Sequence, residues 1–211
     1  MFGHKEEPQL RQRIAPVPPG LGCGLIEGTQ VATEGGWIAA ETLRLGDRVL
    51  TFDGGLQEVL AVVHEELWCT IGPCPEACWP LLVPAGNIGN RNEILVLPHQ
   101  GVLIETDRAR DRWGDPFAVV PGAALAALPG VERLEPYGVV EVVKPVFAED
   151  QMIFADHGAL LFCQSYWGVD VGLVPRVGVP GNYNMLPLDA GLKLVRETGA
   201  LYHEIARPVA A

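Results

Sequence analysis

The 211-residue sequence contains no apolar run that approaches about 20 residues, so no transmembrane helix is expected. It also lacks a signal-peptide layout, because the opening MFGHKEEPQLRQRIAPVPPG has no basic segment followed by an apolar one. We therefore expect a protein of a bacterial-type cytoplasm, or one exported by a non-classical route. No internal repeat of about 20–50 residues is apparent, which argues against a solenoid.

Basic residues are scarce: 15 Lys and Arg stand against 26 Asp and Glu, which gives a formal net charge of −11. Phosphate backbones repel such a chain, so no nucleic-acid partner is expected. The one stretch with several arginines, residues 107–112, alternates them with aspartates and is typical of a solvated loop. Neither nucleic acid nor a membrane is expected as a partner, whereas a protein partner or a larger assembly is compatible with this composition.

Aromatic residues make up only 7 % of the chain, but hydrophobic residues make up 48 %, which is enough for a globular core. The 25 glycines and 18 prolines interrupt helices frequently. This combination predicts a mostly β fold of short strands joined by turns.

Three parts are predicted along the chain. Residues 1–19 are polar, end in Ala-Pro-Val-Pro-Pro, and are expected to form a flexible Pro-rich arm. Residues 20–166 carry the strand patterns of a β domain. Residues 167–211 form a C-terminal extension, rich in Gly, Pro and Asn at first and then helical over Leu188–Thr198, with Gly199 just past the helix end.

Short runs of β-branched and apolar residues between turn signals predict the strands of this domain. A helical or 3-10 turn is expected within Trp37–Leu45, and a strand, a turn and a short helix within Phe117–Leu128. Ile94–Ile104 is expected to form two strand halves that meet at a kink, because Pro98 cannot donate to a ladder. The remaining predicted strands are Gln30–Thr33, Arg48–Phe52, Gln57–Glu65, Val139–Phe147, Gln151–Phe154 and Ala159–Cys163.

Cys23 stands between Gly22 and Gly24, where the backbone can adopt strained conformations. A thiolate there can attack the carbonyl of Gly22 and move the acyl group from nitrogen to sulfur. That step needs a lowered thiol pKa or a nearby base, and His99 is the candidate base. The alternative is a structural role, because a free cysteine often behaves as a small buried hydrophobe.

A second group, His64, Cys69, Cys74 and Cys78, contains four residues that can bind zinc, although their spacing is looser than that of paired C-x-x-C ribbons. A zinc ion, a Cys–Cys bridge and three free thiols in an insertion loop are the alternatives. Apart from this zinc, no cofactor is expected. The odd total of five cysteines argues against a complete disulfide framework.

The order of motifs resembles the Hint (Hedgehog/intein) superfamily, especially its short bacterial Hint_2 type. That family opens with a nucleophilic cysteine, three residues, Gly-Thr and a strand, followed by a Leu-Gly-Asp turn; its second block is a Ser/Thr-Pro-x-His strand. The resemblance covers residues 20–166 and implies a horseshoe-like β fold with autoprocessing chemistry. Its matching segments here are Gly28–Thr33, Leu45–Thr51, Val96–Leu103, Phe117–Ala123 and Phe147–Ala155 followed by Gly158–Cys163.

This sequence departs from the family at both chemical positions. Counted back from Gly-Thr, the family's cysteine position falls on Gly24, and Cys23 stands one residue earlier. In the second block the histidine position falls on Gln100, and His99 again stands one residue earlier; Leu97 takes the Ser/Thr position. A one-residue slip on a strand turns a side chain to the opposite face unless a β-bulge restores it.

Two functions follow from the resemblance. In the first, a degenerate, non-splicing Hint-like domain acts as a structural or binding module, through its arm and its C-terminal extension. In the second, the domain cleaves before Cys23 through a thioester, with His99 as the base or amide-protonating group and Thr33 or Asp150 as supports. The two shifted positions favour the first. Full splicing is not expected, because the given sequence closes on Arg-Pro-Val-Ala-Ala and not on a His-Asn pair.

Overall fold

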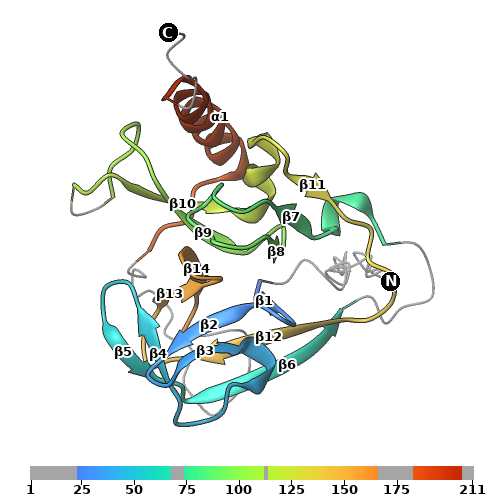
Figure 1. Cartoon of the computed structure of the whole chain (residues 1–211), viewed down its shortest axis with the longest axis vertical. Coiled ribbons are helices and arrows are strands. Elements are labelled where there is room, and N and C mark those ends of the chain that lie inside the picture. The colour runs from blue at the N-terminus through green and yellow to red at the C-terminus, as the bar shows by residue number, and fades with distance from the viewer. Residues whose placement is uncertain (1–22, 68–73, 112–113, 166–182, 206–211) are drawn as a thin grey trace, which may run out of the picture.

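The computed structural model describes residues 23–67, 74–111, 114–165 and 183–205, and its mostly β architecture confirms the predicted fold class (Figure 1). The predicted arm, residues 1–19, and the boundary at residue 167 lie outside the described residues. No helix in the described parts of the chain is long and apolar enough to cross a membrane.

The described residues form fourteen strands, one long helix and three segments of 3-10 helix. The elements are β1 (Leu25–Ile26), β2 (Gln30–Thr33), β3 (Gly36–Ala39), η1 (Ala40–Thr42), β4 (Arg48–Thr51), β5 (Gly55–Glu58), β6 (Ala61–Leu67), η2 (Glu76–Cys78), β7 (Leu81–Val83), β8 (Ile94–Val96), β9 (Gly101–Glu105), β10 (Phe117–Pro121), η3 (Gly122–Ala127), β11 (Glu132–Arg133), β12 (Val140–Val146), β13 (Gln151–Ala155), β14 (Ala159–Cys163) and α1 (Leu188–Ile205) among the described residues.

The strands form three sheets. The largest runs in the order β10-β9-β14-β13-β2-β4-β5, with β3 paired to β2. A second has the order β1-β12-β6, and a third has the order β11-β7-β8. In Figure 1 the first six strands and β12 occupy the lower half and β7 to β11 lie with α1 in the upper half, while β13 and β14 connect the two.

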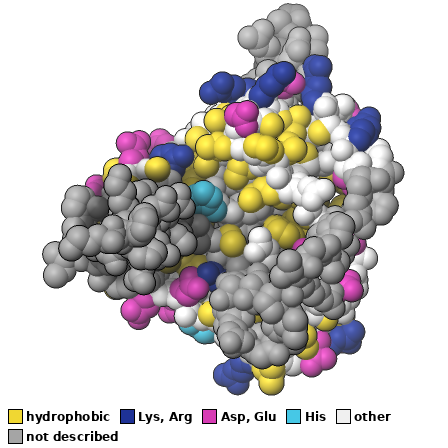
Figure 2. Space-filling model, turned by 180° about the vertical axis from the view of Figure 1, so that it is seen from behind, with side chains coloured by type: hydrophobic (Ala, Val, Ile, Leu, Met, Phe, Trp, Pro, Cys, Tyr) yellow, Lys and Arg dark blue, Asp and Glu magenta, His cyan; other side chains and the backbone are white. Residues whose placement is uncertain are grey.

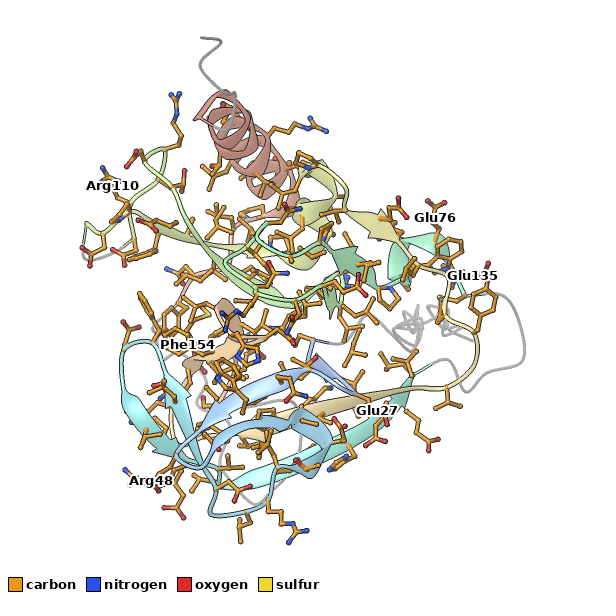
Figure 3. All side chains as sticks on the ribbon, in the orientation of Figure 1. Glu27, Arg48, Glu76, Arg110, Glu135 and Phe154 are labelled. Atoms are coloured by element: carbon orange, nitrogen blue, oxygen red, sulfur yellow. The ribbon has the colours of Figure 1, made fainter. Side chains whose placement is uncertain are left out.

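One apolar core joins these sheets. Its fully buried side chains come from many strands, among them Val31, Val49, Leu81, Val102 and Ile153, so the core is continuous through the molecule. Hydrophobic side chains also gather over the middle of the face seen in Figure 2, whereas the charged side chains of Arg48, labelled at the edge of the body in Figure 3, and of Glu27 are exposed.

One predicted strand differs in the structure. The long strand expected over Gln57–Glu65 is two strands, because the chain changes sheets at Val59 and Leu60. The Val59 N–H donates to the carbonyl of Asp47 beside β4, whereas the Leu60 N–H donates to that of Val146 at the end of β12. The turn expected within Trp37–Leu45 is confirmed as η1, and the residues before it form β3, which pairs with β2.

The C-terminal helix is longer than expected, because α1 continues through Gly199 to Ile205. An interior glycine costs about 1 kcal/mol in a helix, but the helix is anchored by burial of Leu194, Val195 and Thr198. Gly191 allows this close packing: a Cβ there would lie 3.2 Å from the Cβ of Ala124 in η3. Tertiary packing therefore outweighs the local stop signal.

The start of η3 packs directly on the turn between β8 and β9. The Gly122 N–H donates to the carbonyl of Gln100 at 2.7 Å, and the Ala123 N–H donates to that of Pro98 at 2.8 Å. A Cβ added at Gly122 would lie only 2.3 Å from the carbonyl oxygen of Leu97. Glycine is therefore required here for the close approach of two backbones.

We expect Gly122→Ala to lower the free energy of unfolding by about 1–3 kcal/mol, because overpacking forces the two backbones apart. Urea unfolding followed by circular dichroism measures this change. Gly35→Ala is the matched control, since a Cβ there meets only the Thr33 Oγ1 at 3.8 Å. Equal effects of the two substitutions would contradict the predicted role of Gly122.

Candidate functional site

The turn between β8 and β9 decides which of two neighbouring side chains enters the molecule. The predicted kink is confirmed: β8 ends at Val96, and the Gln100 N–H donates to the carbonyl of Leu97 at 3.0 Å before β9 begins. This turn leaves His99 exposed and points Gln100 inward, where it is only 1 % exposed.

The Gln100 carboxamide joins three segments of the chain. Its Oε1 accepts a hydrogen bond from the Gly24 N–H at 2.8 Å. Its Nε2 donates to the carbonyl of Phe162 at 2.8 Å and to that of Gly101 at 3.0 Å. Both amide hydrogens and the amide oxygen are used, as a buried glutamine requires. The entrance to β1, the start of β9 and the end of β14 are thereby held together.

Gly24 has no room for a side chain. Its φ is +148°, and an added Cβ would lie 2.4 Å from Val142 Cγ1 and 3.1 Å from Lys144 Cγ. In the resemblance Gly24 stands at the family's cysteine position and Gln100 at its histidine position. The structure brings these two positions into direct hydrogen-bond contact, occupied by a glycine and a glutamine.

Cys23, directly before Gly24, is a half-buried free cysteine that packs against the main core. Burial raises the pKa of its thiol above the ordinary value, the Lys144 ammonium opposes this shift, and the Glu65 carboxylate adds to it. Since burial has the largest effect, the thiol is less ionised near neutral pH than an exposed cysteine.

Lys144 is a buried cation that sequence reasoning did not single out. Its side chain is 7 % exposed, and its Nζ lies 2.5 Å from Glu65 Oε2 on the neighbouring strand β6. A charge this deeply buried needs a partner, and the carboxylate supplies one. The signal for it in the sequence was a lysine within the otherwise largely apolar run of β12, on the same face as Val142.

Cys163, at the end of β14, is a second thiol close to Cys23. It is fully buried, and burial raises the pKa of its thiol, with a smaller contribution from the Cys23 thiol. Sequence reasoning treated it only as the last residue of a closing strand. The two cysteines lie 140 positions apart in the sequence, and the hydrogen bonds of Gln100 to Gly24 and to Phe162 link the segments that carry them.

The other predicted catalytic residues have different surroundings. The Thr33 hydroxyl donates to the carbonyl of Gly36 at 2.7 Å, within the β2–β3 hairpin. Asp150 Oδ1 accepts hydrogen bonds from the Ser165 N–H at 2.7 Å and from its hydroxyl at 2.9 Å. Among the described residues no hydrogen bond or ion pair joins His99, Thr33 or Asp150 to Cys23.

The predicted zinc ligands are only partly described. His64 Nδ1 lies 2.6 Å from Glu141 Oε1 across the β6–β12 ladder. Cys74 and Cys78 are both free, so they do not form a bridge with each other, and Cys69 lies outside the described residues. Within the described ranges no three His, Cys, Asp or Glu side chains are grouped closely enough to hold a metal ion. Zinc therefore stays a prediction.

Two neighbouring cavities, of about 670 and 370 Å³, lie elsewhere in the fold and share Phe52, Leu103 and Phe117 in their walls. The Phe52 ring meets that of Phe117 edge-on at 5.2 Å, between ring centroids. Val195 and Thr198 of α1 complete the wall of the smaller cavity. Neither cavity is lined by Cys23, Gly24 or Gln100, so these hollows are separate from the candidate site.

Comparison with known protein families assigns the β domain of this chain to one of them. The family model Hint_2, described as Hint domain, matches residues 23–167. The chain belongs to the Hint domain family. The match begins at Cys23 and contains Gly24, Gln100 and Cys163, whereas α1 lies beyond it. No curated protein matches the chain.

Several solved structures are similar to this Hint domain. The bacterial intein-like domain from Clostridium thermocellum is 14 % identical, covers 66 % of this chain and 98 % of its own, and has a TM-score of 0.45. The gp41-1 intein is 15 % identical, and its match covers 67 % of this chain and 98 % of the intein, with a TM-score of 0.40. The MchDnaB-1 intein is 16 % identical, and its match covers 64 % of this chain and 98 % of the intein, with a TM-score of 0.36.

Gln100→Ala is expected to destabilise the Hint domain, because it leaves the Gly24 N–H and the Phe162 carbonyl without their partner. The cost is about 1–3 kcal/mol for each buried group left unpaired. His99→Ala is the matched control: an exposed neighbour on the same turn should change the free energy of unfolding by no more than about 0.5 kcal/mol. Chemical denaturation compares the two, and a larger effect at His99 would refute this assignment.

The raised pKa of Cys23 predicts slow alkylation by iodoacetamide at pH 8, with a rate that continues to rise above pH 9, because only the thiolate reacts. Lys144→Met removes the cation that, among the described residues, lowers this pKa, so the rate profile should move to still higher pH. Mass spectrometry of the Cys23 peptide gives the rates. A profile that moves to lower pH in the variant would contradict this account of the site.

Proposed function

We propose that this chain is a degenerate, non-splicing Hint domain that acts as a structural or binding module. The observation that carries the proposal is the hydrogen bond from the Gly24 N–H to Gln100 Oε1. It joins the two positions at which the family resemblance expects a nucleophile and its histidine. Glycine has no nucleophilic atom, and a neutral carboxamide does not exchange protons near neutral pH.

The surroundings of the two residues support the same conclusion. Because a Cβ at position 24 would overlap Val142, a nucleophilic side chain cannot be placed there on this backbone. The glutamine is held by three hydrogen bonds that use its full capacity, which is the arrangement of a structural group. A module of this kind acts through a protein partner or within a larger assembly, in the cytoplasm or after export by a non-classical route.

Autoprocessing before Cys23 is the second candidate, and one observation favours it. The buried Lys144 ammonium stabilises the Cys23 thiolate, the species that would attack the carbonyl of Gly22. Transfer of the acyl group from nitrogen to sulfur would form a thioester, which an added thiol would then cleave. The exposed position of His99 and the raised thiol pKa count against this candidate.

Intact-mass measurement of the purified chain, incubated with and without dithiothreitol from pH 6 to pH 9, separates the two candidates. The degenerate module predicts an unchanged mass under every condition. Release of the Met1–Gly22 piece in the presence of dithiothreitol, abolished in Cys23→Ala but retained in Cys163→Ala, would refute the module and establish processing at Cys23. Cleavage that Cys23→Ala does not prevent would point to a contaminating protease, and the module would still stand.

A further inference from the structure

The segments of the Hint domain that carry Cys23 and Cys163 are joined through one side chain. Gln100 accepts from the N–H of Gly24, the residue directly after Cys23, and donates to the carbonyl of Phe162, the residue directly before Cys163. Both hydrogen bonds measure 2.8 Å and both end on the same carboxamide. The backbones that carry the two thiols are therefore held within the width of one amide group and two hydrogen bonds.

The two side chains also face the same interior. Along β14 the side chains alternate between two clusters: Phe162 packs with Leu103 and Met152, whereas Cys163 belongs to the main core. Cys23 packs against that main core as well, at the entrance to β1. Both thiols therefore adjoin the same core, and the charge of a Cys23 thiolate adds to the raised pKa of the Cys163 thiol.

We propose that Cys23 and Cys163 form a reversible disulfide that links the segment before β1 to the end of β14. A disulfide needs Cα atoms about 4.4–6.8 Å apart, and Gln100 already holds the residues next to the two cysteines at the two ends of one carboxamide. Both thiols are free in the structure, which is therefore the reduced state of the pair.

The oxidant of this reaction is a low-molecular-weight disulfide. Cys23, the more exposed thiol, loses its proton and attacks one sulfur of the small disulfide, which releases one thiolate and leaves a mixed disulfide on Cys23. Cys163 then loses its proton and attacks the Cys23 sulfur, which releases the second thiolate. The released thiolates take up the two protons, so two protein thiols are oxidised and one small disulfide is reduced to two thiols.

This disulfide would change the stability of the domain and the state of the Cys23 thiol, whether or not the domain cleaves its own chain. The bond would close a loop that contains nearly all of the described β domain, so the oxidised chain should unfold at a higher temperature than the reduced chain. It would also consume the Cys23 thiol, so that no acyl transfer to Cys23 could take place in the oxidised state.

The test uses the full chain with Cys69, Cys74 and Cys78 replaced by serine, so that only the proposed pair remains. After incubation with oxidised glutathione at pH 8 and removal of the glutathione, the protein is unfolded and treated with N-ethylmaleimide. We expect no maleimide to be incorporated and a mass lower than that of the reduced protein by two hydrogen atoms. After dithiothreitol treatment, both cysteines should be labelled.

Cys163→Ala in the same background is the matched control, and Cys23 in this variant should keep one bound glutathione. If Cys163→Ala does not fold, Cys23→Ala in the same background serves as the control instead. The buried Cys163 of that second variant should take up no glutathione. Three results in the two-cysteine chain would overturn the proposal: a stable glutathione adduct on Cys23, a disulfide-linked dimer, or two thiols that still react with maleimide. Each is distinguishable from cleavage, because none shortens the chain.

Discussion

The rest of the site depends on the buried carboxamide of Gln100. It is the point where the entrance to β1, the β8–β9 turn and the end of β14 meet, and it satisfies backbone groups in two of these segments beside its own strand. Unpaired polar groups at this depth would cost more than the hydrogen bonds gain, so the three segments are fixed relative to one another. Gly122 packs on the same turn, and its N–H donates to the carbonyl of Gln100.

A glutamine suits this position when stability matters more than proton transfer. Its oxygen accepts and its nitrogen donates at every pH, so the hydrogen bonds to Gly24 and Phe162 do not depend on a titration. Among the described residues, Lys144 lowers the pKa of the Cys23 thiol and Glu65 raises it, while the Cys23 thiol in turn raises the pKa of Cys163. The site therefore combines a glutamine bridge with a thiol and an ion pair beside it.

The accessory helix α1 extends the Hint domain beyond the residues that the family model matches. Gly191 lets it approach η3 closely, and its residues Val195 and Thr198 form part of a cavity wall with Leu103 and Phe117 of the family domain. The Thr198 hydroxyl is hydrogen-bonded to that of Thr106 at 2.9 Å inside this contact. The helix is therefore built into the domain and is not a loose appendage.

Local sequence patterns determined the fold class, the strand over Gln30–Thr33, the kink at Pro98 and the family, because turn residues and apolar alternation act over a few positions. The resemblance also predicted that Gly24 and Gln100 stand at the family's cysteine and histidine positions. Only the tertiary structure decided that these two residues meet, and that Lys144 and Cys163 lie beside Cys23. Those contacts depend on sheet order and on side-chain burial across more than 70 positions of sequence, which no local pattern records.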